Sequence, residues 1–238
     1  MSPVAREADE KTVLGSVWLR AEPASTRAPL TREDIVGAAI GILDKEGLDG
    51  LSMRRVAVEL GTAATSALYW RVATKNDLLE LGVDEILAEA LVPTGDGDWR
   101  DQLAVLGLAA YEALDRHPWA TQLLASHAGL GPNYQAYTAR LVEILTTAGF
   151  KGIHLDAAVS AVFHYVVGAA VTDAAWHSTI HRSGLPDSTW ANAAGQHLDI
   201  EPEALTAYLT PDNPAGPTAR FTAGLRVILV GLRPRRLS

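Results

Sequence analysis

The sequence of 238 residues has no cysteine, and only 6% of it is aromatic. The missing thiols exclude a disulfide framework, cysteine-based zinc sites and thiol catalysis, and they fit a reducing cytoplasm. Long apolar runs are also lacking. The longest, from Ala157 to Val171, is short for a membrane span and contains Ser160 and His164. Because the N-terminal residues are polar and show no signal peptide, we expect a cytoplasmic protein.

Positive charge is in deficit overall, since 20 Lys and Arg face 28 Asp and Glu, for a net charge of −8. Its distribution is uneven. Residues 52–76 hold four bases and one acid, a balance of +3. Residues 81–238 hold ten bases, sixteen acids and all seven histidines, a balance of −6. A small basic module therefore sits on a larger acidic body, and hydrophobic residues, at 48%, suffice for a real core.

Apolar residues recur at helical spacing from residue 30 onward, and no stretch favours a strand. Thr31 and Asp34 resemble a capping box at the start of the first helix, Gly47 ends that helix, and Ser52 can cap the next. We expect further helices near 65–70, 76–90, 99–116, 119–126, 134–148, 155–180, 203–209 and 218–232. Residues 182–216, rich in Pro, Gly, Asn and Asp, are otherwise expected to be loop. The prediction is an all-α fold.

The most informative stretch runs from Leu60 to Leu79. A helix ends at Leu60, and Gly61 allows the positive φ of a tight turn. A short helix of small hydroxyl and alanine residues follows, and it ends in the pair Tyr69 and Trp70. This arrangement predicts a helix-turn-helix that enters a DNA major groove.

Each part of this module has a predicted contact with DNA. Hydroxyls at Thr65 and Ser66 suit base edges, and alanine methyls such as that of Ala64 suit thymine. Tyr69 and Lys75 are expected to reach phosphates. Arg20 and Arg27, in the N-terminal arm, are predicted to enter the adjacent minor groove, although an inert, charge-neutral tail remains the alternative. The full predicted DNA-binding set is Arg20, Arg27, Arg54, Thr62, Ala64, Thr65, Ser66, Tyr69, Trp70, Arg71 and Lys75.

The stretch from Thr31 to Ile86 resembles the DNA-binding head of the TetR family of one-component, ligand-responsive repressors. The residues that carry the resemblance are Leu48-Asp49-Gly50-Leu51-Ser52-Met53-Arg54, Val56-Ala57, Leu60-Gly61, Leu68-Tyr69-Trp70-Arg71-Val72 and Lys75-Asn76-Asp77-Leu78-Leu79. One feature departs from the family pattern. Six residues, Thr62 to Ala67, separate the turn glycine from the Leu-Tyr pair, where relatives usually have five.

The resemblance implies a repressor that binds a palindromic operator as a homodimer and leaves it when a small-molecule effector binds. It also implies three parts: a flexible N-terminal arm (1–29), a helix-turn-helix DNA-binding domain (30–75), and a helical ligand-binding and dimerisation domain (76–238). An enzymatic activity, a cofactor and a membrane partner are not expected.

The body supplies candidates for the effector site and for the dimer interface. Its aromatic and histidine residues either pack in the core or orient a small apolar molecule. The predicted ligand-binding set is Leu103, Trp119, His127, Tyr134, Tyr137, Phe163, His164 and Trp176. The predicted dimer interface is the apolar stripe of Phe221, Leu225, Ile228 and Leu229, which a monomer would leave uncovered.

Two alternatives come from other classes of protein. Asp173, His177 and His181 are spaced by four residues, so they would share a helix face and could bind a divalent metal in an enzyme. The competing interpretation is a polar face near a helix end, where histidine favours the helix dipole. The second alternative is a helical protein-interaction module without DNA binding.

Overall fold

The computed structural model describes residues 16–19, 30–61, 66–124, 126, 129–211 and 213–234. Every regular element in these residues is a helix, so the all-α prediction is confirmed. The elements are η1 (Val17–Leu19), α2 (Arg32–Gly50), α3 (Met53–Glu59), α4 (Ser66–Tyr69), α5 (Lys75–Ala88), α6 (Trp99–Arg116), α7 (Pro118–Leu124), α8 (Pro132–Thr147), α9 (Ile153–Ser183), α10 (Asp187–Leu198), α11 (Pro202–Leu209) and α12 (Pro217–Gly231).

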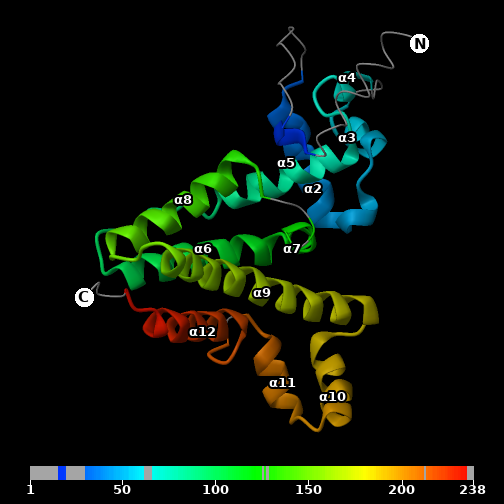
Figure 1. Ribbon diagram of the computed structural model, residues 1–238. Coiled ribbons are helices and arrows are strands. Elements are labelled where there is room, and N and C mark those ends of the chain that lie inside the picture. Colours follow the sequence, from blue (N-terminus) through cyan, green and yellow to red (C-terminus); the bar gives the residue numbers. More distant parts are fainter. Residues whose placement is uncertain are drawn as a thin grey trace.

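Helices α2, α3 and α4 form a small head at one end of the molecule, and α5 leads from it into the body (Figure 1). Helices α6, α7, α8 and α9 pack together in the body, and α12 lies along α6 and α9 on the side away from the head. Helices α10 and α11 form a hairpin at the far end of α9. Head and body meet where α2 contacts α5 and α7.

Side-chain caps fix where the helices of the head begin. The predicted capping box is confirmed: the Asp34 amide donates to the Thr31 hydroxyl at 3.1 Å, and the Thr31 amide donates to the Asp34 carboxylate at 3.0 Å. Ser52 caps α3 as predicted, and Thr74 with Asp77 forms a second capping box at the start of α5. Each such cap stabilises a helix by about 1 kcal/mol, so local sequence sets these boundaries.

The prediction that residues 182–216 are mostly loop is wrong, because α10 occupies 187–198. This helix packs on α11 around a small cluster of Ile180, Ala191, Leu205 and Leu209. The inward positions of α10 are mainly alanine and glycine, so the sequence shows little hydrophobic period there. Tertiary packing, not local propensity, therefore stabilises this hairpin.

The expectation that a monomer leaves the α12 stripe uncovered is also wrong. Phe221, Leu225 and Leu229 are each only 2% exposed, and they face α6 and α9 of the same chain. The ring of Phe221 stacks on Tyr111 at 4.2 Å. Gly107 lets Leu225 approach α6, since an added Cβ would lie 2.8 Å from the leucine side chain. The stripe, in which Ile228 is partly buried, belongs to the core of the protomer.

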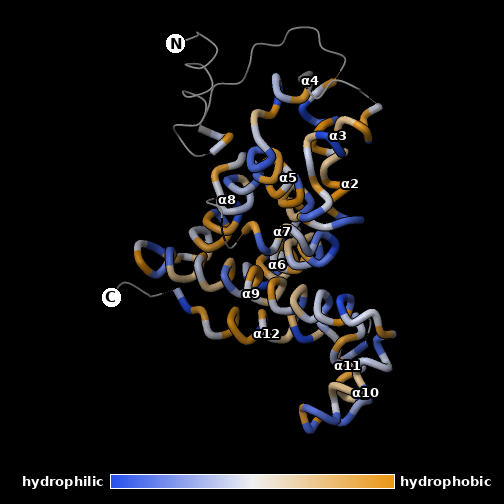
Figure 2. Tube along the Cα trace, turned by 90° about the vertical axis from the view of Figure 1, so that its right-hand side faces the viewer, coloured by the Kyte–Doolittle hydropathy of each residue, from blue (hydrophilic) through white to orange (hydrophobic). Residues whose placement is uncertain are grey.

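A different face of α9 and α12 is left open. On α12 the exposed side chains include Val227 and Val230, which are 74% and 64% accessible. Figure 2 shows hydrophobic stretches recurring along α5 and α12. Among the described helices, only α9 is apolar and long enough to qualify as a membrane span, but it packs against α6, α7, α8, α10 and α12. Its remaining face, which includes Gly168 and Val171, is exposed.

Candidate functional site

The short helix α4 is held so that its aromatic end projects into solvent. Leu68 and Val72 are fully buried and anchor this end of the head in the core. Gly61 adopts a φ of +65°, as the predicted turn requires. Tyr69 and Trp70 are 49% and 74% exposed, which is a large apolar surface for so small a head. The arrangement presents two aromatic side chains at the end of α4 to solvent.

The two adjacent arginines of α3 have different roles. Arg55 forms ion pairs with Glu46 at 3.0 Å and Glu59 at 3.1 Å, so its guanidinium is held against the head. Arg54 is exposed and makes no ion pair or hydrogen bond within the described chain. Its five donors are therefore available to a base or a phosphate, as the sequence predicted for Arg54 and not for Arg55.

Most of the other residues predicted to contact DNA either have partners within the protein or lie outside the described residues. The Lys75 ammonium donates to the Leu48 carbonyl at 2.9 Å, which ties the start of α5 to the head and leaves further donors exposed. Arg71 is partly exposed and already has an interaction within the protein. Ser66 begins α4. The predicted residues that lie outside the described part of the chain are Arg20, Arg27, Thr62, Ala64, Thr65 and His127.

Helix α5 connects the head to every other part of the candidate site. Its first residue contacts the head through Leu48, as described above. One turn on, the Glu80 carboxylate accepts bonds from the Ser16 hydroxyl at 2.5 Å and the Val17 amide at 3.3 Å, so it holds η1. The Asp84 carboxylate accepts the amides of Asn133 at 3.2 Å and Tyr134 at 2.9 Å, and thus caps α8. The same helix therefore contacts the head, the N-terminal arm and the body.

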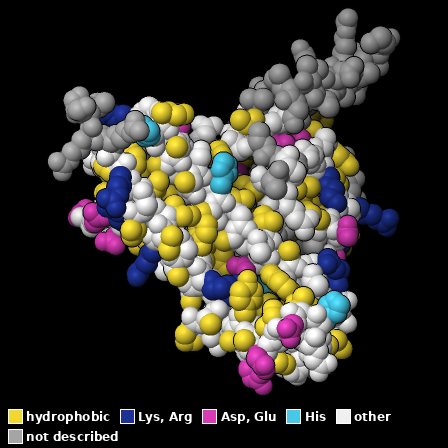
Figure 3. All heavy atoms as spheres, turned by 60° about the horizontal axis from the view of Figure 1, so that its bottom comes forward, with side chains coloured by type: hydrophobic (Ala, Val, Ile, Leu, Met, Phe, Trp, Pro, Cys, Tyr) yellow, Lys and Arg dark blue, Asp and Glu magenta, His cyan; other side chains and the backbone are white. Residues whose placement is uncertain are grey.

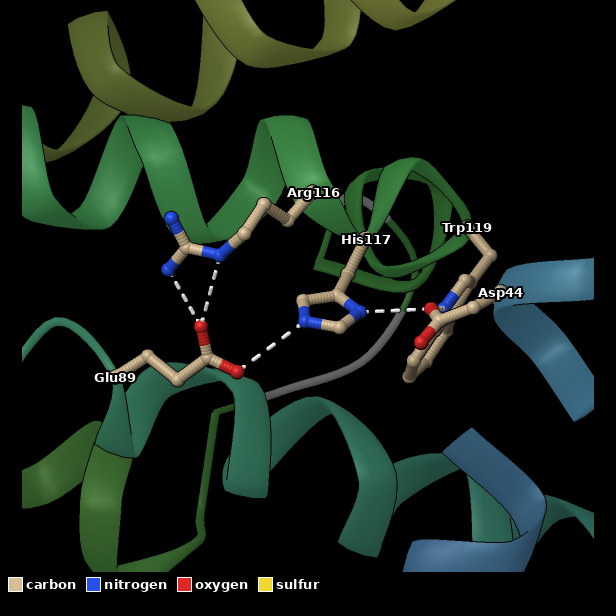
Figure 4. A network of polar contacts seen from close by, with 5 residues as sticks. All are labelled: Asp44, Glu89, Arg116, His117 and Trp119. Carbon is tan, nitrogen blue, oxygen red and sulfur yellow. Dashed lines mark hydrogen bonds and ion pairs between the residues drawn. The ribbon is translucent and has the colours of Figure 1, made fainter. Parts of the chain in front are cut away.

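At its C-terminal end α5 meets a polar junction between head and body (Figure 4). His117 stands between Asp44 of α2, with Nδ1 2.7 Å from its carboxylate, and Glu89, with Nε2 3.2 Å from its carboxylate. Each ring nitrogen therefore lies within hydrogen-bond distance of a carboxylate, so the imidazole links α2 to the end of α5. Arg116 also bonds Glu89, at 2.5 Å. No sequence pattern indicates this junction, because His117 lies 73 and 28 residues from its partners Asp44 and Glu89.

Trp119 belongs to this junction. Its indole N–H donates to the Asp44 carboxylate at 2.7 Å, and its ring packs beside Gly82 of α5. Trp119 does not line the cavity beside α5, and its contact with a ligand stays a prediction. An aromatic residue at a helical core position and one at a domain junction have the same sequence pattern, so only the fold distinguishes them.

A cavity lies where η1, α5, α7 and the start of α8 meet. Its lining residues are Trp18, Glu80, Val83, Asp84, Leu87, Leu123, Leu124, Gly129, Leu130, Gly131 and Tyr134. The space between their atoms is about 350 Å³ including the part open to solvent, but water can occupy only about 30 Å³ of it. That is room for one or two waters, so a larger molecule must widen the cavity. Burial raises the pKa of Asp84, although the amides of Tyr134 and Asn133 favour its charged form.

The other predicted ligand residues do not form one pocket. The ring centroid of Phe163 on α9 lies 5.6 Å from that of Tyr134 and 6.5 Å from that of Tyr137. The three rings therefore form a cluster, of which Tyr134 lines the cavity. The Tyr137 hydroxyl is buried and has no hydrogen-bond partner, and burial raises its pKa. His164 is exposed, next to Phe163. Leu103 is a core residue, and Trp176 packs in the distal hairpin against Trp190 and Tyr208.

The metal-binding alternative is not supported by the fold. Asp173 turns inward, where its carboxylate accepts from the Tyr111 hydroxyl at 2.7 Å and from Arg220 at 3.2 Å. His181 is exposed, and the described residues contain no group of three metal-ligating side chains. Each step of four residues turns about 40° around a helix, so Asp173 and His181 point about 80° apart, with His177 between them.

An exposed helix-turn-helix carried on a helical body with a cavity defines a one-component transcriptional regulator. A family model described as "Tetracyclin repressor-like, C-terminal domain" matches residues 93–236. The chain is 36% identical to an HTH-type transcriptional regulator of Saccharopolyspora erythraea, over 92% of this chain and 91% of the relative. The chain belongs to the TetR family of transcriptional regulators.

Two solved structures show the same fold in bound states. ActR of Streptomyces coelicolor in complex with actinorhodin superposes with a TM-score of 0.68 at 29% identity, covering 86% of this chain and 96% of that one. BioQ with its natural double-stranded DNA operator superposes with a TM-score of 0.55 at 34% identity, covering 61% and 88%. The similarity to ActR extends over head and body.

Proposed function

We propose that the protein is a homodimeric repressor that binds a palindromic operator and leaves it when a small molecule enters the cavity beside α5. The observation that carries this proposal is the course of α5. Its first turn is bonded to the head, its middle lines the cavity, and its end meets the His117 junction. A ligand that moves this helix therefore changes the orientation of the head.

The relatives support both halves of the proposal. The matched family model is named for the tetracycline repressor, and BioQ and ActR are similar structures that hold an operator and a small molecule, respectively. A repressor acts on chromosomal DNA, so we propose that this one is cytoplasmic. We also propose that it has no enzymatic activity, because its relatives are regulators and the Asp173 cluster serves packing. A module without DNA binding would leave the exposed Tyr69, Trp70 and Arg54 unexplained.

The exposed face of α9 and α12 is the proposed dimer interface. Figure 3 brings the side of α12 and the hairpin forward and shows hydrophobic side chains gathered mostly over the middle of this face. Val227 and Val230 supply apolar contacts on α12, and Gly168 allows close approach on α9. Two copies joined here would present two heads to successive major grooves, about 34 Å apart, as a palindromic site requires.

The test is a footprint on the DNA that flanks the protein's own gene. We expect a protected palindrome with half-sites about one helical turn apart and an affinity that falls steeply with salt. Candidate metabolites are then tested for release. Arg54→Ala should weaken binding by about 1–3 kcal/mol and relax one operator position, whereas Arg55→Ala is the matched control. Absence of any protected site at low salt would contradict the proposal.

A further inference from the structure

The N-terminal segment Ser16–Leu19 covers the cavity beside α5 although it precedes the head in sequence. It is anchored by the two bonds from Ser16 and Val17 to the Glu80 carboxylate, and Trp18 forms part of the cavity lining. Trp18 also packs against the main hydrophobic core. Removing this segment would open the cavity to solvent on that side, so η1 lies where a lid would lie.

The cavity wall holds two carboxylates that have no cationic partner within the described chain. Glu80 and Asp84 are both buried, one turn apart on α5. All their hydrogen bonds come from neutral donors: a hydroxyl, an asparagine amide and backbone N–H groups. Neither carboxylate has an ion-pair partner within the described chain. A buried carboxylate without a cation is unfavourable, and a cationic ligand would relieve that.

The same wall disfavours an anion. The N-terminus of α8 would otherwise attract negative charge, but the Asp84 carboxylate already occupies it. Gly131 lies so close to this carboxylate that a Cβ there would clash with it, so the cap leaves no room for a second anion. A phosphate or carboxylate ligand would therefore meet a carboxylate instead of free N–H groups.

The rest of the lining fits an apolar body. Five aliphatic side chains and the rings of Trp18 and Tyr134 surround the two acids. Aromatic faces attract cations as well as apolar groups, by about 0.5–2 kcal/mol. We propose that the cavity binds an apolar molecule that bears a cationic amine, with the amine at Glu80 and Asp84 and Trp18 of η1 as its lid. This inference rests on the proposed function and specifies its effector class.

A charge series on one carbon skeleton tests the ligand class. Calorimetry compares 4-phenylbutylamine, 4-phenylbutanol and 4-phenylbutyrate on the full-length protein without DNA. The amine should bind about tenfold more tightly than the alcohol, which corresponds to one additional charge-assisted contact, and the carboxylate should bind most weakly. Equal or tighter binding of the alcohol or the carboxylate, or no binding of the amine, would overturn the proposal.

Two pairs of variants test the role of the Glu80 carboxylate and the role of Trp18 separately. Glu80→Gln keeps the shape of the side chain and should reduce the preference for amine over alcohol to less than about threefold; Glu85→Gln, exposed on the same helix, should leave it intact. Trp18→Ala should weaken amine and alcohol together, by about tenfold, whereas Trp70→Ala in the head should not. Unchanged affinities in Trp18→Ala would refute the lid.

Operator release distinguishes this inference from the proposed function. If a neutral or anionic compound releases the operator and 4-phenylbutylamine does not bind, the proposed effector class is wrong. The proposed repressor function would still hold. If 4-phenylbutylamine binds with the predicted selectivity while no protected DNA site exists, the amine-binding site is confirmed and the proposed repressor function is wrong. Release of the operator by the amine and not by the alcohol at equal concentration supports both.

Discussion

Replacing His117 by alanine tests whether the junction in Figure 4 couples head and body. The substitution removes a side chain that contacts both Asp44 of the head and Glu89 at the end of α5. The two carboxylates then lose the imidazole that links them, while the Trp119 indole still donates to Asp44. The head should therefore be held less firmly against the body.

The magnitude follows from the exposure of the partners. Hydrogen bonds to charged groups contribute about 1.5–3 kcal/mol each when they are sheltered. The side chains of Asp44 and Glu89 are 32% and 38% exposed and that of His117 is 13% exposed, so solvent screens both pairs. We expect a loss of about 2 kcal/mol in the free energy of unfolding. Arg116→Ala is the control, since this arginine is 53% exposed, contacts the same Glu89 and does not reach the head, and it should lose less than about 1 kcal/mol.

Urea unfolding at a fixed protomer concentration measures the stability, and fluorescence anisotropy with the operator measures the functional effect. A less ordered head loses more conformational entropy on binding DNA, so His117→Ala should weaken operator binding several-fold more than Arg116→Ala does. If the two variants are indistinguishable in both assays, the junction does not couple head and body.

The remaining predictions concern the operator and the dimer. Lys75→Ala should weaken binding to all sequences about equally and reduce the salt slope by roughly 1, as measured by anisotropy across a salt series; a sequence-selective loss would show that it reads bases. Val227→Glu should give folded monomers in sedimentation, because it places a charge on the open face of α12, whereas Leu225→Glu should lower the thermal midpoint because it places one in the core. If the Val227→Glu variant still forms a stable dimer, α12 is not part of the dimer interface.

Local signals were predictable from the sequence. The caps at Thr31 and Ser52 depend on residues three positions away, and the turn at Gly61 depends on one residue, so short patterns determine them. The choice of Arg54 over Arg55 was also possible, although the Glu46 and Glu59 pairs that explain it appeared only in the fold.

Features that depend on packing between distant segments were not predictable. The stripe of Phe221 and Leu225 has a helical period, but the period does not say whether α6 or a second copy covers it. The bond from Trp119 to Asp44 spans 75 residues, so no local pattern predicts the place of Trp119 in the junction. The role of Trp18 as part of the cavity wall depends on a bond between Ser16 and Glu80 that spans 64 residues.

The central claim is that occupation of the cavity changes how the two heads are placed. Because the chain has no cysteine, Lys45→Cys on the exposed surface of α2 gives one spin label per head. Electron–electron resonance then measures the distance between the two labels in the dimer. We expect one narrow distance distribution with the operator bound, and a shifted or broader one after adding the compound that releases the operator. The same distribution in both states, or no dipolar signal between labels, would contradict it.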